Sequence, residues 1–383
     1  MCIMAYFRVY LQSEHPPMDM ELLLIIICSL SALAYILQII SPYLSFMKKM
    51  DDKSTSSDPV SVIISARNEA ENLSMNLPSI LSQDHPAFEV IVIDDASWDS
   101  TGDILSGLKE SYKNLSVVTI TEEQKRTEGK KFALTLGIKR AKFDNLLFTD
   151  ADCQPRSAHW ISQMSRSMHN GIVLGYGEYR KGKGLLNSLV RFDCWTGSTH
   201  FLGMALRGHP YIGVGRNLCY TKEIYEASGG FRRHYHLISG DDDLFVNQAA
   251  TSKNTGVVIT GDAFTSTNTP GKWSSWIRKK TRHLSSSKAY SSKTKRMLFM
   301  KYSALCLFYL SLIAGLILSK AYLILAGIFL GKTLIHMLIS LPAAKRLAAI
   351  DVLVLLPVLE PLNLVVNTYA TIKMRWSKTI PWN

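Results

Sequence analysis

Two pairs of aspartates in this chain could hold a divalent cation. Asp94 and Asp95 end one apolar run, and Asp150 and Asp152 stand in the sequence TDAD directly after another. Carboxylate oxygens suit Mg²⁺ or Mn²⁺, and a cation held by one or two carboxylates usually completes its coordination with phosphate oxygens and water. Each pair could instead cap a following helix, because aspartate accepts hydrogen bonds from the first N–H groups of a helix. The residues alone leave both interpretations open.

The elements that position these pairs alternate between strand and helix. We expect strands at residues 60–65, 88–94, 116–120 and 145–149, separated by helices at 69–81, 99–111 and 129–142. Such alternation is typical of an α/β fold with an open, mostly parallel sheet and helices on both faces. Sheets of this kind bind ligands just beyond the carboxyl ends of their strands. Both aspartate pairs would then lie at the same edge.

The composition indicates a membrane protein with one soluble domain. Of the 383 residues, 47% are hydrophobic and only 19% are charged, which excludes intrinsic disorder. Residues 22–40 could cross a bilayer as a retained anchor, and residues 302–319 and 321–344 could form a second and a third span. Because Lys48, Lys49 and Lys53 follow the first span, the large domain is expected in the cytoplasm, at the cell (inner) membrane.

The last apolar region, residues 347–372, is interrupted by charged residues and prolines. It could cross the membrane, or it could form a broken hairpin that keeps Lys373 and Arg375 on the cytoplasmic side. Lys332 and Glu360 also lie in apolar sequence. They could neutralise each other inside a helix bundle, or they could line the path of an acceptor.

Four parts of the chain are therefore expected. They are an N-terminal transmembrane anchor (1–50), a cytoplasmic α/β domain (51–271), a basic interfacial segment (272–301) and a C-terminal transmembrane region (302–383). The six cysteines form no C-x-x-C pair, so neither disulfides nor structural zinc is expected. The sequence has no Walker loop and no G-x-G-x-x-G after the first strand, which disfavours a P-loop NTPase and a dinucleotide-dependent oxidoreductase.

From about residue 59 to residue 283, the order of motifs resembles that of membrane-bound family 2 glycosyltransferases, which have the GT-A fold. PVSVIISARNEAENL is similar to the first strand and turn of that family, IDDASWDST to its second-strand motif and EGKKFAL to its Gly-Lys element. TDADCQP matches the D-x-D signature, and SGDDDLFVN resembles the acidic catalytic motif. The resemblance implies a nucleotide-diphosphate sugar as donor and Mg²⁺ or Mn²⁺ as cofactor.

The resemblance also implies roles for individual residues. Those expected around the nucleotide, its diphosphate or its metal are Arg67, Glu69, Asp94, Asp95, Lys130, Asp150 and Asp152. Asp150 and Asp152 would face the metal. Asp242 would be the general base with Asp241 beside it, although the sequence itself leaves Asp243 open. Such a base takes the proton of an acceptor hydroxyl as the oxygen attacks the anomeric carbon. Further residues expected on the acceptor side are Gly215, Arg216 and Asn217.

The final signature of that family, Q-x-x-R-W, is altered in this chain. The stretch KKTRH at residues 279–283 keeps Arg282, which could bind a diphosphate bidentately, but it lacks the Gln and the Trp. The missing Trp puts processive polymer synthesis in doubt. With ten Lys and Arg between residues 272 and 301, the segment could also be an interfacial helix on anionic lipid.

These features together predict a membrane-bound inverting glycosyltransferase. It would move a sugar to a lipid or lipid-linked saccharide acceptor at the cytoplasmic face, with no nucleic acid among its partners. The alternatives are a processive polysaccharide synthase, a catalytically silent membrane scaffold, and a metal-dependent nucleotidyltransferase or phosphatase acting on lipid phosphates. Detection of a transferred nucleotide instead of a sugar would identify the last of these.

Overall fold

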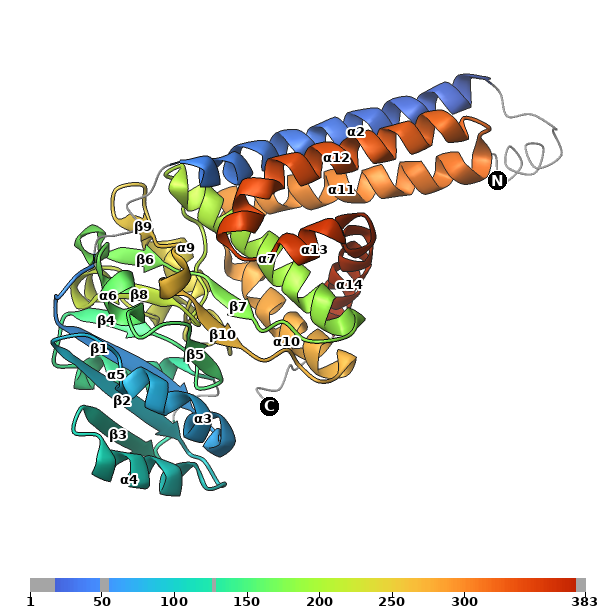
Figure 1. Ribbon diagram of the computed structural model, residues 1–383. Coiled ribbons are helices and arrows are strands. Elements are labelled where there is room, and N and C mark those ends of the chain that lie inside the picture. The colour runs from blue at the N-terminus through green and yellow to red at the C-terminus, as the bar shows by residue number, and fades with distance from the viewer. Residues whose placement is uncertain (1–17, 49–54, 126–128, 377–383) are drawn as a thin grey trace.

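The computed structural model describes residues 18–48, 55–125 and 129–376. Figure 1 shows an α/β domain from which three long helices extend to one side. Lys49 and Lys53, on which the expected orientation partly rests, lie outside the described residues, as does Cys2. The cysteines within them are all free thiols: Cys28, Cys153, Cys194, Cys219 and Cys306.

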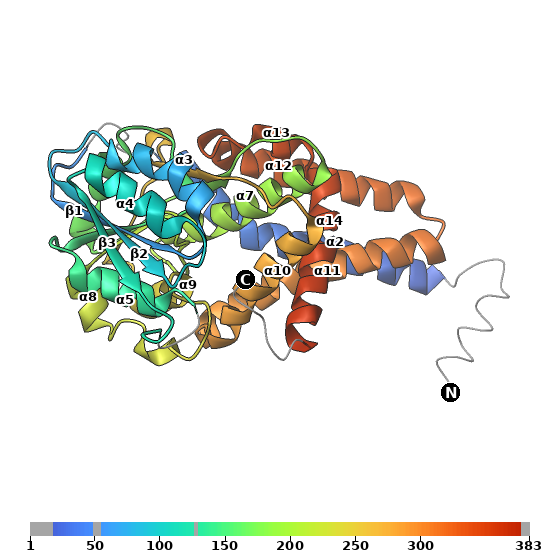
Figure 2. The ribbon, with the colours of Figure 1, turned by 90° about the horizontal axis from the view of Figure 1, so that it is seen from below.

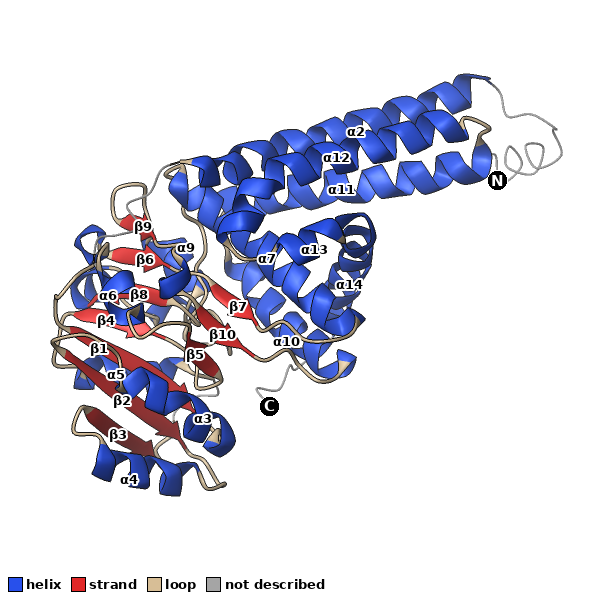
Figure 3. Cartoon of the chain, in the orientation of Figure 1, coloured by secondary structure: helices blue, strands red, loops and turns tan. Residues whose placement is uncertain are grey.

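A seven-stranded sheet with the order β3-β2-β1-β4-β8-β6-β9 forms the centre of the α/β domain (Figure 3). The parallel part consists of β3 (Leu115–Ile120), β2 (Phe88–Asp95), β1 (Val60–Ala66) and β4 (Asn145–Phe148). The rest consists of β8 (Leu218–Thr221), which is antiparallel to both neighbours, β6 (Ile172–Leu174) and β9 (Thr255–Val257). The expected mostly parallel α/β sheet is confirmed.

Strand β1 shows why this sheet forms. All seven of its residues are buried, because helices cover both faces of the sheet. A run of β-branched residues supplies apolar side chains to each of the two faces. Val62 and Ile64 pack in the hydrophobic cluster of one face, whereas Ile63 packs in that of the other. The first face carries α3 (Ala70–Leu81), α4 (Thr101–Ser111) and α6 (Trp160–Ser165), and the second carries α5 (Lys131–Arg140) and α7 (Leu185–Leu206).

A smaller sheet and two short helices complete the domain. The sheet has the order β5-β10-β7 and consists of β5 (Cys153–Pro155), β10 (Thr265–Thr267) and β7 (Gly177–Tyr179). The short helices are α8 (Lys222–Ala227) and α9 (Asp243–Ala249). Because β5 begins directly after Asp152, this sheet adjoins the D-x-D sequence.

Among the described residues, three helices are long and apolar enough to cross a membrane, as expected from the sequence. They are α2 (Met18–Leu44), α11 (Ser292–Leu318) and α12 (Tyr322–Arg346), and the candidate spans are Met20–Met47, Ser292–Leu318 and Tyr322–Arg346. They lie side by side in Figures 1 and 2. Large apolar side chains point outward from all three, among them Leu37, Leu310 and Leu323. Lipid would cover such a surface.

The interrupted fourth region forms two helices, α13 (Ile350–Val354) and α14 (Leu356–Trp376). In Figure 2, α14 runs across the direction of the three long helices, and it packs on α7 and on α10 (Trp273–Ser286). Arg191 of α7 holds Asp351 of α13 through two hydrogen bonds of 2.7 and 2.9 Å. Instead of a fourth parallel span, the structure places a helix across the base of the bundle.

Lys332 of α12 and Glu360 of α14 form a buried ion pair. The Nδ1 atom of His336 lies 2.9 Å from the Oε1 atom of Glu360. Of the two alternatives for these charges, the structure shows mutual neutralisation.

Candidate active site

The carboxyl ends of β2, β1 and β4 meet at one edge of the large sheet. In the register of these strands, Ala66 at the end of β1 is opposite Asp94 of β2, and Ile63 is opposite Phe148 at the end of β4. Asp150 follows β4 after one residue. The two aspartate pairs therefore lie at the same edge of the sheet, as their positions in the sequence predicted.

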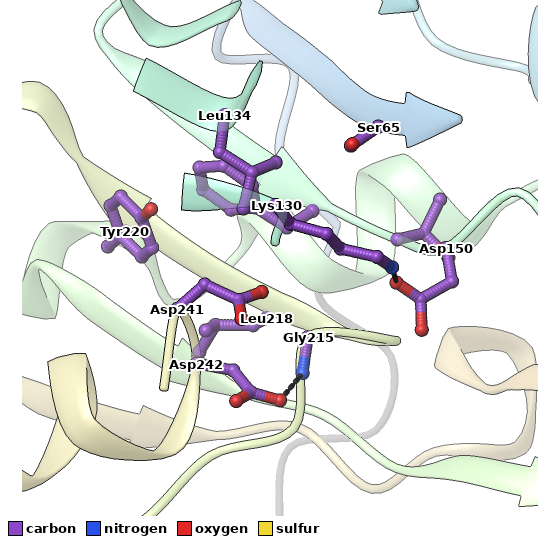
Figure 4. Close-up of a pocket in the computed structure, with 11 residues that line it drawn as sticks. Ser65, Lys130, Leu134, Asp150, Gly215, Leu218, Tyr220, Asp241 and Asp242 are labelled. Carbon is purple, nitrogen blue, oxygen red and sulfur yellow. Dashed lines mark hydrogen bonds and ion pairs between the residues drawn. The ribbon is translucent and has the colours of Figure 1, made fainter. Parts of the chain in front are cut away.

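A small cavity at this edge brings the D-x-D sequence and the acidic motif together. Its volume is about 20 Å³, and Lys130, Asp150, Gly215, Asp241 and Asp242 are among its lining residues. Figure 4 shows Lys130 reaching to Asp150 on one side, and Asp241 and Asp242 lying on the other. Residues more than 90 positions apart in the sequence thus converge on one space.

Lys130 and Asp150 form the ion pair at the centre of the site, with 2.5 Å between Nζ and Oδ1. Burial raises the pKa of Asp150, but the nearby Lys130 ammonium outweighs this and holds the pKa below its usual range. Lys130 stands at the N-terminus of α5, directly after Gly129. Gly129 has φ +91°, and a Cβ atom there would lie 2.3 Å from the carbonyl oxygen of Ile238. Only glycine fits this turn without a shift of the backbone.

The side chains at the D-x-D sequence fit a divalent cation. Ligand atoms of Asp150, Asp152 and Cys153 all lie within 4.8 Å of one another. Burial raises the pKa of the Cys153 thiol well above its usual value, so this sulfur stays protonated, and it donates to Oδ1 of Asp152 at 3.3 Å. Two hard carboxylates remain as ligands, which is a donor set for Mg²⁺ or Mn²⁺ rather than for a soft metal.

Neither aspartate pair supplies the N-cap of the helix that follows it, since these N-cap residues are Ser100 for α4 and His159 for α6. Asp94 accepts a hydrogen bond from the N–H of Ser97 within the turn after β2, at 3.2 Å. It is Asp99 that accepts from the N–H of Thr101 at the start of α4, at 3.0 Å. Both aspartate pairs therefore remain candidates for ligand binding at the edge of the sheet.

Two turns with unusual backbone angles form the outer part of this edge. Asn68 after β1 and Ala96 after β2 have φ values of +55° and +56°. The turns bind each other, because the N–H of Asn68 donates to Ser97 Oγ at 2.9 Å and the N–H of Trp98 donates to Asn68 Oδ1 at 3.0 Å. Strained backbone of this kind is concentrated at functional sites, where the surrounding structure holds it in place.

The remaining residues expected around the nucleotide lie near these turns and do not line the cavity. Arg67 lies over the ring of Trp98 at 5.2 Å and pairs with Glu122 at 3.1 Å. Asp95 is buried, with its Oδ2 atom 3.9 Å from Nζ of Lys125. Glu69 accepts from Asn72 at 2.5 Å, and burial raises its pKa. The ring of Trp98 is 68% exposed.

Asp242 is held by backbone groups with its carboxylate at the cavity. Its Oδ2 atom accepts from the N–H of Gly215 and its Oδ1 atom from the N–H of Asp243, each at 2.7 Å. Burial and the neighbouring Asp241 and Asp243 raise the pKa of Asp242 well above the usual range of a carboxyl group. Burial raises the pKa of Asp241 as well. A carboxylate with a raised pKa is suited to accept a proton near neutral pH.

Asp243, which the sequence left open as a base, has a structural position. Its Oδ2 atom accepts hydrogen bonds from the hydroxyl groups of Tyr290 (2.6 Å) and Ser286, and its Oδ1 atom accepts from the N–H of Leu244 (2.7 Å). It does not line the cavity. Asp243 thus ties the acidic motif to the end of α10 and leaves Asp241 and Asp242 as the candidate bases.

Lys131, which the sequence gave no role, holds the segment before the acidic motif. Its buried Nζ atom donates to the carbonyl oxygens of His234, Leu237 and Ser239 at 2.6, 2.8 and 2.7 Å. Only 2% of this residue is exposed. The available signal was a charged residue at the beginning of the helix, directly before the apolar residues Phe132, Ala133 and Leu134.

The altered Q-x-x-R-W stretch places Lys279 beside the D-x-D sequence. Arg282 does not line the cavity, and its carbonyl oxygen accepts from Ser239 Oγ at 3.2 Å. Lys279, one turn earlier on α10, lies 3.8 Å from Oδ2 of Asp152 and 5.6 Å from the ring centre of Tyr179. The guanidinium of Arg216 lies over the same ring at 4.6 Å. Sequence reasoning missed both Lys279 and Tyr179.

The acceptor-side residues expected from the sequence divide into two groups. Gly215 and Arg216 lie at the site, whereas Asn217 is buried beneath it. The Asn217 side chain accepts from Trp160 Nε1 at 3.0 Å and donates to the carbonyl oxygen of Tyr176 at 3.0 Å. Asn217 therefore supports the site from below.

Comparisons with known proteins agree with this geometry. The family described as glycosyl transferase family 2 matches residues 61–226. Glycosyltransferase AglE of Haloferax volcanii is 32% identical over 195 residues, which are 50% of this chain and 60% of that protein. The 4,4'-diaponeurosporenoate glycosyltransferase of Staphylococcus haemolyticus is 36% identical over 134 residues, 34% of each chain. The chain thus spans 60% and 34% of the lengths of these two relatives.

One solved structure resembles the whole chain. It is the mannosyltransferase PcManGT from Pyrobaculum calidifontis in complex with GDP-Man and Mn²⁺, with a TM-score of 0.58 and 20% sequence identity. The likeness covers 92% of this chain and 100% of that one, and at this identity it shows the fold. The matching motifs and the shared architecture lead to one conclusion: residues 61–226 are similar to glycosyl transferase family 2, and the α/β domain has the GT-A fold.

Proposed function

We propose that this protein is a membrane-bound inverting glycosyltransferase, which moves a sugar from a nucleotide-diphosphate sugar to a lipid or lipid-linked saccharide. The observation that carries the proposal is the cavity of Figure 4. It has the Lys130–Asp150 pair on one side and Asp241 and Asp242 on the other. A donor bound along this edge of the sheet would have its diphosphate near the D-x-D sequence and its anomeric carbon on the side of Asp242, within reach of an acceptor oxygen.

The donor side supplies positive charge for a departing diphosphate. A divalent cation at Asp150 and Asp152 supplies Lewis-acid neutralisation of that charge when bound. Lys130, Lys279 and Arg216 are the cations of this chain around the same carboxylates, and such fixed charges stabilise a leaving group in place of water. GDP-Man and Mn²⁺ in the mannosyltransferase of the same fold support a donor and a metal of this class.

The nucleotide would lie on the outer part of the sheet edge. Arg67, Glu69, Asp94 and Asp95 border the two interlocked turns there. The exposed ring of Trp98, next to the Arg67 guanidinium, offers a flat surface to a base. We assign the base contact to Asp94 or Asp95, since these are the last two residues of β2.

The acceptor side needs one proton acceptor. Asp242 would take the proton of the acceptor hydroxyl as the hydroxyl oxygen attacks the anomeric carbon. Burial and the neighbouring Asp241 keep the pKa of Asp242 high. A single displacement breaks the bond from the anomeric carbon to the diphosphate oxygen, and the product has inverted configuration. The two backbone N–H groups that bind Asp242 fix its orientation.

The membrane helices would bring the acceptor to this site. Helix α7 contacts the long helix α2 closely, because a Cβ atom at Gly203 would lie 2.2 Å from the carbonyl oxygen of Pro42. The same helix places Cys194 3.6 Å from the Arg216 guanidinium.

Residues 51–271 would form the cytoplasmic domain and residues 272–301 a basic interfacial segment. With three spans and this orientation, α14 with Lys373 and Arg375 would lie on the cytoplasmic side of the inner membrane.

The first experiment measures nucleotide release from a panel of GDP- and UDP-sugars, with Mn²⁺ and total membrane lipids as acceptor. The wild type is compared with Asp242→Asn and with Asp262→Asn, which changes an exposed acid. We expect release and a labelled lipid from the wild type and from Asp262→Asn only. Equal release by Asp242→Asn would refute the assignment of the base, and no release by any of the proteins would favour a silent scaffold. A nucleotide on the product would indicate a nucleotidyltransferase.

A further inference from the structure

A second cavity, of about 60 Å³, lies between the α/β domain and the membrane helices. Five helices line it, because its residues come from α2, α7, α11, α12 and α14. It shares no residue with the cavity at the D-x-D sequence. Its walls are partly apolar, with Phe192 and Leu305, and partly polar, with Lys301, Asn363 and Asn367.

Lys301 is the unusual residue of this cavity. It is 8% exposed, and its ammonium group lies 5.4 Å from the ring centre of Tyr302 but has no hydrogen bond or ion pair with any residue in the described part of the chain. An ammonium group removed from water without a partner costs several kcal/mol, so buried charges are normally paired. A negatively charged group beside Lys301 would compensate the charge of its ammonium group.

The acids of the cavity do not supply that group, since each has a cation of its own. Asp193 lies 2.5 Å from Nζ of Lys280. Glu360 pairs with Lys332 and lies 2.9 Å from His336. With both carboxylates paired to a lysine, Lys301 leaves one positive charge uncompensated.

Neutral polar groups next to Lys301 are available as well. The side-chain oxygen of Asn363 is buried and has no hydrogen-bond partner among the described residues. The amide of Asn367 makes only a long contact of 3.4 Å to Asp193. One water needs roughly 10–15 Å³ of such space, so the cavity has room for a group of several heavy atoms. One negative charge with several oxygens is the chemistry of a phosphate ester.

We propose that this cavity binds the phosphate group of an anionic membrane lipid, with Lys301 as its counter-charge. Lys301 directly precedes the apolar run of α11, where lipid headgroups meet the hydrocarbon layer. Tyr302 beside it is 42% exposed toward the surface that lipid would cover. A phosphate held there would sit behind α7 and α10, which separate it from the D-x-D edge. The proposal does not depend on sugar transfer.

The test is lipid binding to the delipidated full-length protein, followed by native mass spectrometry. Phosphatidylglycerol, zwitterionic phosphatidylcholine and inorganic phosphate are titrated separately. The variants are Lys301→Met and the control Lys293→Met, which changes an exposed lysine in the first turn of the same helix. We expect one tightly bound phosphatidylglycerol in the wild type and in Lys293→Met, and at least tenfold weaker binding in Lys301→Met. Equal binding in Lys301→Met, or no preference for phosphatidylglycerol, would overturn the proposal. Inorganic phosphate that competes at equal concentration would assign the site to a free ion instead.

A second variant tests the site without changing a charge. Gly197 lines the cavity on α7, and a Cβ atom there would meet nothing within 4 Å. Gly197→Leu should therefore fill the cavity and remove the bound lipid while Lys301 stays in place, and leucine is the better helix former. Phosphatidylglycerol should raise the melting temperature of the wild type but not of Gly197→Leu. A variant that melts normally and still retains the lipid would contradict the assignment.

Discussion

Replacing Lys131 by methionine tests whether this lysine holds the segment before the acidic motif. Methionine keeps much of the volume and removes the ammonium, which donates to the carbonyl oxygens of His234, Leu237 and Ser239 at 2.6–2.8 Å. Burial lowers the pKa of Lys131 to about 8, against the attraction of the three aspartates, so the ammonium is charged at neutral pH. The variant leaves three carbonyl oxygens without their donor.

The expected loss of free energy on replacing Lys131 follows from the three hydrogen bonds of its ammonium group. A hydrogen bond to a charged group contributes about 1.5–3 kcal/mol, and burial of the ammonium offsets several kcal/mol of the sum. We therefore expect the free energy of local opening of the segment to fall by about 2–4 kcal/mol. At 1.4 kcal/mol per factor of ten, amide exchange there should accelerate roughly 30- to 700-fold.

Hydrogen–deuterium exchange of peptides that cover residues 231–240 measures this change directly. Lys139→Met, an exposed lysine in the last turn of the same helix, is the matched control and should leave the exchange unchanged. Transfer activity should fall in Lys131→Met as well, because Asp241 and Asp242 follow the loosened segment. Unchanged exchange in Lys131→Met, or acceleration spread evenly over the whole domain, would refute a local anchoring role.

Three more predictions concern the acids of the site. The rate of transfer should rise with pH through an inflection above about 4, the ordinary pKa of an aspartate, because Asp242 must be ionised to act and its pKa is raised. A pH series of nucleotide release measures this inflection, and a value at or below about 4 would contradict the prediction. Removal of divalent cations with a chelator should weaken the binding of a nucleoside diphosphate, as measured by titration calorimetry. Adding Mn²⁺ or Mg²⁺ should restore binding to the wild type but not to Asp152→Asn. An equal response of both proteins would argue against Asp152 as a metal ligand. Asp243→Asn should lose about 1–3 kcal/mol of stability through its contact with Tyr290, which a thermal melt detects, whereas the exposed Asp262→Asn should melt like the wild type.

The strands and the D-x-D edge could be predicted because their causes are local. A run of β-branched residues followed by a turn places β1 at Val60–Ala66, one residue longer than expected. Asp150 comes shortly after β4 in the sequence, so predicting the strand also predicts where Asp150 lies. The carboxyl ends of parallel strands must meet at one edge, so the position of the site also follows.

What sequence reasoning missed depends on contacts between distant segments. Asp243 is 47 residues from Tyr290, and Lys131 is 103 residues from His234, so neither contact leaves a periodic pattern. Lys279 lies near Asp152 because α10 is fixed by its packing on α14, and this packing decides which face of α10 meets the D-x-D edge. Tertiary packing of this kind cannot be read from spacing.

The most direct test separates donor binding from transfer in Asp242→Asn. Titration calorimetry with the identified nucleotide sugar gives the dissociation constant, and product formation with membrane lipid gives the rate. Because we propose that Asp242 acts on the acceptor and not on the donor, we expect an unchanged dissociation constant and a rate lower by roughly 10²–10⁴-fold. Asp150→Asn should instead lose donor binding. A transfer rate of Asp242→Asn within a few-fold of the wild type would contradict the proposed role of Asp242 as the base.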